Sequence, residues 1–386
     1  MFGQFNDSFK PIMDGVGVCA ENYALWLSRE HGGAAMVAPS APGYEDSEGY
    51  PVLRYPSIPF PRIKPYRIGL PAVGFQFKGR LRALPLSLVH AHSPFIAGKL
   101  ALKEARRRNI PLVATFHTKY REDFSMVVSQ KSVVDRLVRR VVSFYREAAE
   151  VWAPNAKTAE TLKEYGYDGE VVVMANGTDL EIPTEEEYLV YRERGNKLIG
   201  DAQRPLLLFV GQHRWEKNVA LIIDAAARLK REGADFRLAF VGTGYAAGEM
   251  KKRVVASGLE AVTHFAGLVL DREVIKSYYA RGALFIFPSL YDNAPLVMRE
   301  ASAFRCPSVL ARGSSAAEGF TDNKDVFLTD PEPESMATVV RRLLGKPELL
   351  ERVGREAQRT IYLPWRKVVE EVAARYENLI ASETSR

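Results

Sequence analysis

The regular alternation of short apolar runs with amphipathic segments between residues 205 and 311 restricts the fold of this chain more than any other sequence feature. Runs such as PLLLFV, FRLAFV and LFIF have the length of buried strands, and segments such as VALIIDAAARLKREG separate them. Strands that alternate with helices of about 10–15 residues indicate βαβ units, in which helices cover both faces of a parallel sheet. The sequence therefore predicts a doubly wound α/β fold.

The first half of the chain repeats this alternation less regularly, in SLVHAHSP, PLVATFH and EVWAPN, after a weak first strand in MFGQFND. A chain of 386 residues exceeds what one hydrophobic core usually supports. The polar, charged stretch 183–203 is the best candidate for a linker. We therefore predict two Rossmann-like domains, 1–182 and 204–362, that face each other across a cleft.

Composition excludes few functions. Apolar residues make up 47% and charged residues 26%, as in ordinary globular proteins. The net charge of +6 favours an anionic partner such as a nucleotide or a lipid. Nucleic acid ranks last, because acids nearly balance bases and no nucleic-acid-binding module is recognisable. With two distant cysteines, no membrane-length apolar run and no signal-peptide pattern, a cytoplasmic protein is expected.

In the second half, polar residues follow the predicted strands, where ligands bind in open α/β sheets. Asp292 is expected in the loop after LFIFPSL, and Glu300 about two turns into the helix from Leu296. A carboxylate in an apolar helix is costly unless it is paired or ligand-bound, and it suits a ribose diol. Lys217 either neutralises a diphosphate or is simply solvated, and Gly242 ends a strand or approaches a ligand.

In the first half, His117 closes the strand PLVATFH and is the better functional candidate among the histidines there. For His90 and His92 we favour a structural role, as satisfied buried side chains. The glycines of DGVGV, Gly15 and Gly17, bring backbone amides close to a ligand or form a plain turn.

A basic amphipathic helix is predicted within residues 131–150. Its apolar residues recur with helical spacing, and arginines, Arg136, Arg139 and Arg140 among them, decorate the other side. An ordinary helix that packs on the sheet with a solvated basic face is the favoured interpretation, since such stripes are mostly core. The alternative is peripheral contact with an anionic membrane, which would place the protein at the inner face of the membrane.

Taken together, the blocks DSFKPIMDGVGV, VHAHSPF, VATFHT, MANGTDL, VGQHRWEKN, FVGTG and FPSLYDNAPLVMREA resemble the retaining GT-B glycosyltransferases of family 4 over nearly the whole chain. The two acids separated by seven residues are the most specific of these features. The resemblance implies a GT-B fold whose last helix, 363–382, packs back on the first domain. HTKYREDF resembles the corresponding loop in members that glycosylate lipids.

The resemblance also implies roles for the candidate residues of the second domain. Glu300 would hold the ribose hydroxyls of a nucleotide-sugar donor, Asp292 would lie near the hydroxyls of the transferred sugar, and Lys217 would meet the diphosphate. A lysine and helix N-termini can stabilise a departing diphosphate. We therefore expect no metal and no cofactor.

In the first domain, the resemblance places Gly15 and Gly17 in a loop under the phosphates and His117 near the anomeric centre. Retention would follow the family's front-face mechanism, in which the leaving phosphate helps to deprotonate the acceptor.

Three positions depart from the family pattern. Gln212 stands where an arginine is usual, and Arg214 is the substitute that could reach the donor. Asp292 is one methylene shorter than the usual glutamate. Pro295 replaces a glycine and has no N–H for a phosphate, although Leu296 still offers one.

The sequence thus predicts a retaining, metal-independent hexosyltransferase that uses a UDP-sugar or, next, a GDP-sugar. The acceptor would be a glycolipid, a lipid-linked saccharide or another saccharide. The departures keep open a non-catalytic subunit that binds a nucleotide-sugar or a partner protein. A sugar-nucleotide epimerase is a further alternative.

Overall fold

The computed structural model describes residues 1–12, 14–61 and 65–384. The chain divides into two compact units. Unit 1 comprises Met1–Gly177 and Trp365–Arg386, and unit 2 comprises Thr178–Pro364.

Unit 1 is built on a parallel sheet in the order β3-β2-β1-β6-β7-β8-β9. The weak first strand of the sequence is a central, fully buried strand, which pairs with β2 and β6. The strands are β1 (Phe2–Phe5), β2 (Ala34–Pro39), β3 (Val52–Tyr55), β6 (Leu88–Ala91), β7 (Leu112–Thr115), β8 (Glu150–Ala153) and β9 (Val171–Val173), with a small antiparallel pair, β4 (Ser57–Pro59) and β5 (Arg67–Gly69).

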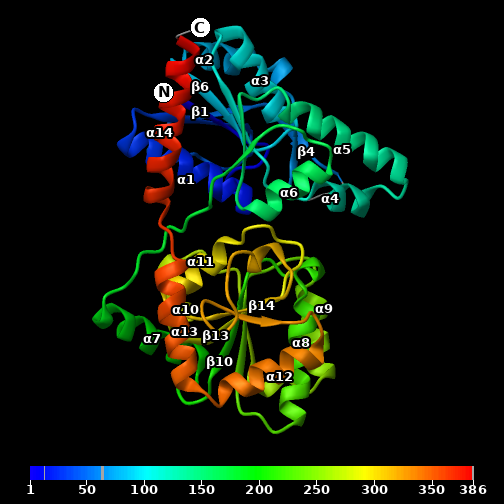
Figure 1. Ribbon diagram of the computed structural model, residues 1–386, viewed down its shortest axis with the longest axis vertical. Coiled ribbons are helices and arrows are strands. Elements are labelled where there is room, and N and C mark those ends of the chain that lie inside the picture. Colours follow the sequence, from blue (N-terminus) through cyan, green and yellow to red (C-terminus); the bar gives the residue numbers. More distant parts are fainter. Residues whose placement is uncertain (13, 62–64, 385–386) are drawn as a thin grey trace. The chain divides into compact units, whose positions relative to one another are not determined.

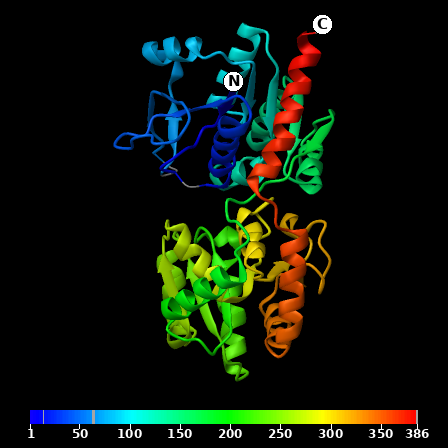
Figure 2. The same ribbon diagram turned by 90° about the vertical axis from the view of Figure 1, so that its left-hand side faces the viewer.

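Helices cover this sheet, and the helix at the end of the chain is one of them. It lies against the first helix, α1, as Figures 1 and 2 show. The helices of unit 1 are α1 (Gly15–Glu30), η1 (Pro71–Val73), α2 (Phe75–Ala83), α3 (Ile96–Arg108), α4 (Tyr120–Val127), α5 (Lys131–Tyr145), α6 (Ala156–Glu164) and α14 (Trp365–Thr384).

Unit 2 contains a second parallel sheet in the order β12-β11-β10-β13-β14-β15. The apolar runs of the sequence form its strands, and the carboxyl-terminal part of each of the two central strands is buried. The strands are β10 (Leu206–Val210), β11 (Arg237–Val241), β12 (Thr263–Gly267), β13 (Gly282–Phe287), β14 (Ser308–Ala311) and β15 (Phe327–Thr329).

The helices of unit 2 lie on both sides of its sheet. Figure 1 shows α8, α9 and α12 on one side and α7, α10 and α13 on the other. The helices are α7 (Glu185–Ile199), η2 (Trp215–Lys217), α8 (Val219–Arg231), α9 (Ala247–Ala256), η3 (Glu260–Val262), α10 (Arg272–Arg281), α11 (Leu296–Ala303), η4 (Ser315–Ala317), α12 (Pro333–Leu344) and α13 (Pro347–Thr360).

The predicted linker 183–203 is wrong, because most of it forms helix α7 within unit 2. Thr184 and Glu187 form a capping box at the start of this helix. Gly195 lets α7 approach α10 so closely that a Cβ at this position would lie 2.4 Å from the Ser277 carbonyl oxygen. The helix is polar over much of its length because only one face is buried.

Both sheets reverse their strand order at one point. In unit 1 the chain leaves β1 for β2 and β3 on one side and returns as β6 on the other; in unit 2, β10 and β13 are the corresponding neighbours. At such a switch point the loops after the two strands diverge and leave a crevice at their carboxyl ends, where α/β proteins bind ligands.

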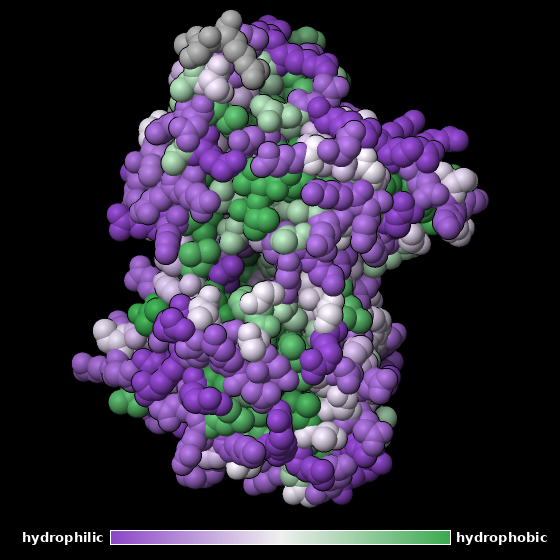
Figure 3. Space-filling model, in the orientation of Figure 1, coloured by the Kyte–Doolittle hydropathy of each residue, from purple (hydrophilic) through white to green (hydrophobic). Residues whose placement is uncertain are grey.

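Among the described residues, no helix is both long and apolar enough to cross a membrane. On the face drawn in Figure 3, hydrophilic side chains cover most of the surface, and hydrophobic ones gather in patches between them.

Candidate functional site

The switch point of unit 2 brings two predicted site residues into contact. Lys217 ends η2 after β10, and Asp292 lies in the loop after β13. The Lys217 ammonium pairs with Asp292 Oδ1 at 2.5 Å, and the Ser289 hydroxyl donates to Asp292 Oδ2 at 2.6 Å. The ammonium also lies 5.3 Å from the centroid of the Phe287 ring. A mostly buried cation is therefore fixed where the two strands diverge.

Glu300 lies in the second turn of α11, as predicted, and its carboxylate is paired. Its Oε1 accepts from the Arg272 guanidinium at 3.0 Å and its Oε2 accepts from the Tyr279 hydroxyl at 2.7 Å. The Glu300 side chain is 12% exposed, and Arg272 also pairs with Asp179. This carboxylate is held rigidly enough to accept hydrogen bonds from a ligand at a defined place.

Gly242 has a structural role, which the sequence left open. A Cβ there would lie 2.0 Å from the Gly211 carbonyl oxygen, and Gly242 has φ +131°. Gly244 packs in the same way, since its Cβ would lie 2.3 Å from the His213 carbonyl oxygen. The loops after β10 and β11 can touch only because both positions lack a side chain.

Gln212 and Arg214 lie in the turn after Gly211, the glycine that follows β10. The Arg214 guanidinium lies 5.5 Å from the centroid of the Tyr291 ring and 3.5 Å from a Glu216 carboxylate oxygen. Arg214 therefore lies beside the loop that carries Asp292. The Gln212 carbonyl accepts from the Arg214 amide at 3.0 Å, which ties the two positions into one turn.

Pro295 is the residue that precedes helix α11, with φ −67° and ψ 122°. Proline suits this position because its fixed φ is compatible with the start of a helix. The first backbone N–H groups of a helix have no carbonyl partner within it, and Leu296 is the first residue of α11. An amide donor for an anion thus remains at Leu296.

The glycines Gly15 and Gly17 lie in the first turn of α1 and not in a loop, which corrects the prediction. Asp14 caps this helix, and its Oδ1 accepts from the Gly17 amide at 2.7 Å. The Gly17 amide is thus occupied by the cap. Gly15 begins the helix in open space, since a Cβ there would meet nothing within 4 Å.

His117 follows β7 and joins a buried cluster of histidines in unit 1. His92 Nδ1 lies 3.2 Å from His117 Nε2, and the His90 and His92 rings stack with centroids 4.2 Å apart. Burial lowers the pKa of His117 to about 3 and those of His90 and His92 well below their ordinary value. All three imidazoles are therefore neutral at pH 7, and the favoured structural role of His90 and His92 fits their complete burial.

Cys19, His92 and His117 are the described residues that approach a metal-ligand grouping, with ligand atoms within 4.8 Å of one another. The histidine nitrogens already share a hydrogen bond, and the Cys19 thiol contacts Asn176 Oδ1 at 3.6 Å. Burial raises the pKa of the Cys19 thiol, whereas a metal ligand must be a thiolate. These side chains suit a neutral hydrogen-bonded cluster better than a metal site.

The apolar stripe of α5 packs into the core of unit 1, as the favoured interpretation predicted. Arg136, Arg139 and Arg140 remain exposed on its outer side. A second surface of mixed character lies at the start of α2, where Phe75 is 83% exposed and Val73 is 61% exposed. We call the surface formed by Val73, Phe75 and Lys78 the α2 patch.

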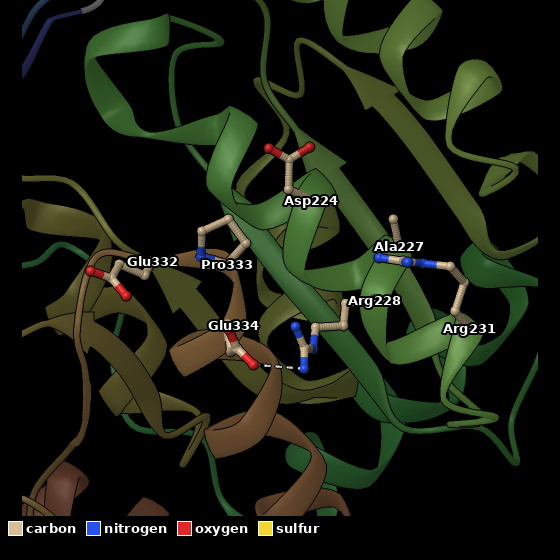
Figure 4. Close-up of a pocket in the computed structure, with 7 residues that line it drawn as sticks. All are labelled: Asp224, Ala227, Arg228, Arg231, Glu332, Pro333 and Glu334. Atoms are coloured by element: carbon tan, nitrogen blue, oxygen red, sulfur yellow. Dashed lines mark ion pairs between the residues drawn. The ribbon is translucent and has the colours of Figure 1, made fainter.

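The hollow drawn in Figure 4 lies on the surface of unit 2 between α8 and α12. Arg228 and Glu334 point toward each other there and form an ion pair of 2.8 Å. None of the predicted donor-binding residues lines it.

Sequence reasoning missed Arg272, Tyr279 and Ser289, which hold the two acids of unit 2. Arg272 and Tyr279 are seven residues apart on α10 and therefore share one helix face. The available signal was the spacing of an arginine and a tyrosine on the helix that follows β12. This spacing could have indicated partners for a carboxylate.

Two parallel sheets flanked by helices, with a lysine and two acids at one switch point, define the class of protein. The chain has the GT-B glycosyltransferase fold. It is similar to the Anabaena protein Alr3699/HepE in complex with UDP and glucose, with a TM-score of 0.74, 16% identity and coverage of 97% of this chain and 98% of the other. It is also similar to sucrose-phosphate synthase from Thermosynechococcus elongatus, with a TM-score of 0.78, 16% identity and coverage of 98% and 96%.

The sequence families agree with this class. Residues 13–182 match Glycosyltransferase Family 4, and residues 193–360 match Glycosyl transferases group 1. The alpha-monoglucosyldiacylglycerol synthase of Streptococcus pneumoniae is 24% identical over 90% of this chain and 79% of the relative. The chain belongs to the group 1/family 4 glycosyltransferases and is a glycosyltransferase enzyme.

Proposed function

We propose that this enzyme transfers a hexose from a nucleotide-sugar, with a UDP-sugar first and a GDP-sugar second, and that it retains the anomeric configuration without a metal ion. The observation that carries the proposal is the arrangement at the switch point of unit 2. There Lys217, in the segment after β10, supplies a positive charge. Glu300, in the helix that follows β13, supplies a carboxylate that can accept hydrogen bonds. A nucleoside diphosphate presents the matching groups, an anion and a ribose diol.

In this mechanism the bond between the anomeric carbon and the phosphate oxygen breaks, and the nucleoside diphosphate leaves with one additional negative charge to be stabilised. Lys217 would exchange its bond to Asp292 for one to the diphosphate, and Asp292 would become available to hydroxyls of the transferred sugar. The Leu296 amide and the dipole of α11 would add to the field at the phosphates. These groups stabilise the charge that develops in the transition state, which is what a leaving phosphate requires.

For the acceptor we propose a glycolipid or another lipid-linked saccharide. The relative in Streptococcus pneumoniae is named as a synthase of a glucosylated diacylglycerol. The α2 patch and the exposed arginines of α5 would supply peripheral contact with an anionic membrane, since an exposed aromatic ring beside cations suits the lipid interface.

The donor is identified by thermal unfolding in the presence of UDP, GDP, ADP and TDP. Ligand at about 100 times its Kd stabilises the protein by about 2.7 kcal/mol. The matching UDP- or GDP-sugar is then offered with vesicles of diacylglycerol or glucosyldiacylglycerol, with and without EDTA. Transfer with retained configuration, unaffected by EDTA, supports the proposal; inversion or loss of transfer in EDTA refutes those parts of it.

Two other outcomes define the alternatives. Nucleotide binding with neither transfer to an acceptor nor hydrolysis of the nucleotide-sugar would favour the non-catalytic subunit. Gln212 and Pro295 are the residues that point to this alternative. An isomerised nucleotide-sugar formed without acceptor would favour the epimerase.

Membrane contact has its own test, which is co-sedimentation with vesicles that contain phosphatidylglycerol or only phosphatidylcholine. Phe75→Ser should reduce binding to the anionic vesicles. Ile58→Ser, at an exposed residue 49% accessible on the small β4 strand, is the matched control. Equal binding by the wild type and Phe75→Ser would remove the α2 patch from the proposal.

A further inference from the structure

The histidines of unit 1 form one connected network that ends at His117. The Tyr376 hydroxyl contacts His90 Nδ1, and His90 Nε2 lies 2.7 Å from Thr115 Oγ1. His92 stacks on His90, and its Nε2 lies 2.8 Å from Gln4 Oε1. These contacts join residues from β1, β6 and β7 to the helix at the end of the chain.

The amide of Gln4 determines the direction of the hydrogen bonds. A side-chain carbonyl oxygen can only accept, so His92 Nε2 must carry the proton that it donates to Gln4 Oε1. His92 is neutral, so its Nδ1 then carries a lone pair. That lone pair faces His117 Nε2 at 3.2 Å, and the hydrogen bond forms only if the His117 Nε2 carries a proton.

The rest of the network fits this direction. The Gln4 side-chain nitrogen donates to the Tyr376 oxygen at 3.5 Å, which leaves the Tyr376 proton for His90 Nδ1. His90 then donates from Nε2 to Thr115 Oγ1. Gln4, His90 and His92 are each fully buried, so water does not compete for these bonds.

We propose that Gln4 and His92 are positioning residues that hold His117 as the neutral tautomer protonated at Nε2, with its lone pair at Nδ1. The inference rests on the proposed function and on the role that the family resemblance implies for His117, near the anomeric centre of the donor. A lone pair accepts from a hydroxyl group and does not bind a phosphate oxygen, which is itself an acceptor. Gln4 would thereby fix, through His92, which kind of group His117 can bind.

The deciding experiment is two-bond ¹⁵N–¹H NMR on the full chain labelled only at histidine. The protein has 6 histidines, so single substitutions can assign the signals. His117 is expected to be protonated at Nε2 in the wild type. The opposite orientation of the Gln4 amide would reverse every bond in the network, so protonation of His117 at Nδ1 overturns the proposal.

His92→Phe removes the acceptor and keeps a flat ring against His90, whereas His92→Asn keeps an oxygen near the position of Nδ1. In His92→Phe the His117 signals should shift toward a mixture of tautomers, and in His92→Asn they should stay near those of the wild type. An unchanged tautomer in a folded His92→Phe protein overturns the proposal. If His92→Phe does not fold, Gln4→Leu replaces it, because it removes the oxygen that accepts from His92 Nε2. Gln4→Glu then takes the place of His92→Asn as the control that keeps an acceptor.

Turnover is followed as UDP release from UDP-glucose. His92→Phe should lower kcat about tenfold, which corresponds to about 1.4 kcal/mol, and change KM by less than about twofold. His92→Asn should recover most of that loss, which a merely structural role would not predict. Wild-type turnover in His117→Ala, together with the expected tautomer in the unmodified enzyme, would overturn the proposed function of His117 and leave the hydrogen-bond direction supported.

Discussion

The Glu300 carboxylate offers the sharpest test of the donor site, through Glu300→Ala. The variant removes the acceptor of two hydrogen bonds, one from Arg272 and one from the fully buried Tyr279. Leaving such donors unpaired costs about 1–3 kcal/mol. For a domain of about 150–250 residues each kcal/mol corresponds to about 2–4 °C, so the melting temperature of the free enzyme should fall by about 2–12 °C.

The same substitution should also weaken nucleotide binding, by a separate effect of similar size. A hydrogen bond to a charged group contributes about 1.5–3 kcal/mol, which is about 10–150-fold in Kd. A nucleotide concentration of about 100 times the wild-type Kd would stabilise the variant by only about 0.3–1.4 kcal/mol, against about 2.7 kcal/mol for the wild type.

The assay is isothermal titration of whichever nucleoside diphosphate gives the largest thermal shift, alongside melting curves with and without it. Tyr279→Phe is the matched control, because it removes one hydrogen bond and keeps the Glu300 carboxylate. It should lose about 1 kcal/mol of stability and bind the nucleotide within about threefold of the wild type. A Glu300→Ala protein that also binds within threefold would show that this carboxylate does not hold the ribose.

Three other perturbations test the rest of the site. Lys217→Met should raise the Kd of UDP at least tenfold and leave uridine binding unchanged in titration calorimetry, since only the diphosphate needs the charge; equal losses for both ligands would refute this. Burial lowers the pKa values of His90 and His92, so below about pH 6.5 the unfolded chain binds more protons than the folded one. The free energy of unfolding, measured in urea, should therefore fall as the pH drops from 7 to 5, by up to about 1.4 kcal/mol per pH unit for each ring. His92→Asn should flatten that slope, and an unchanged slope would contradict the assignment. Gly244→Ala should lower the melting temperature because its Cβ would lie 2.3 Å from the His213 carbonyl oxygen, whereas Gly248→Ala, with nothing within 4 Å, should be neutral or slightly stabilising; equal effects would refute the packing argument.

Local pattern was sufficient for the βαβ units and for the placement of the two acids. The apolar run that forms β13 and the helix that starts at Leu296 leave Asp292 in the loop and Glu300 in the second turn, whatever the rest of the chain does. The segment 183–203 was misassigned because its helix buries one face against α10 through Gly195, and that partner lies far away in the sequence. A half-polar helix and a linker look alike until the surface that covers the helix is known.

The sequence by itself determined the parallel sheets and the chemical types of the candidate residues, because strand periodicity and helix length are local properties of the chain. Only the tertiary structure decided which groups touch. Strand order places Lys217 against Asp292, and helix packing places Arg272 and Tyr279 on Glu300. The histidine network joins Gln4 and Tyr376, 372 positions apart, and so His117's tautomer depends on contacts that no short stretch of sequence contains. Hydrogen bonds act over about 3 Å, and the folded chain alone sets those distances.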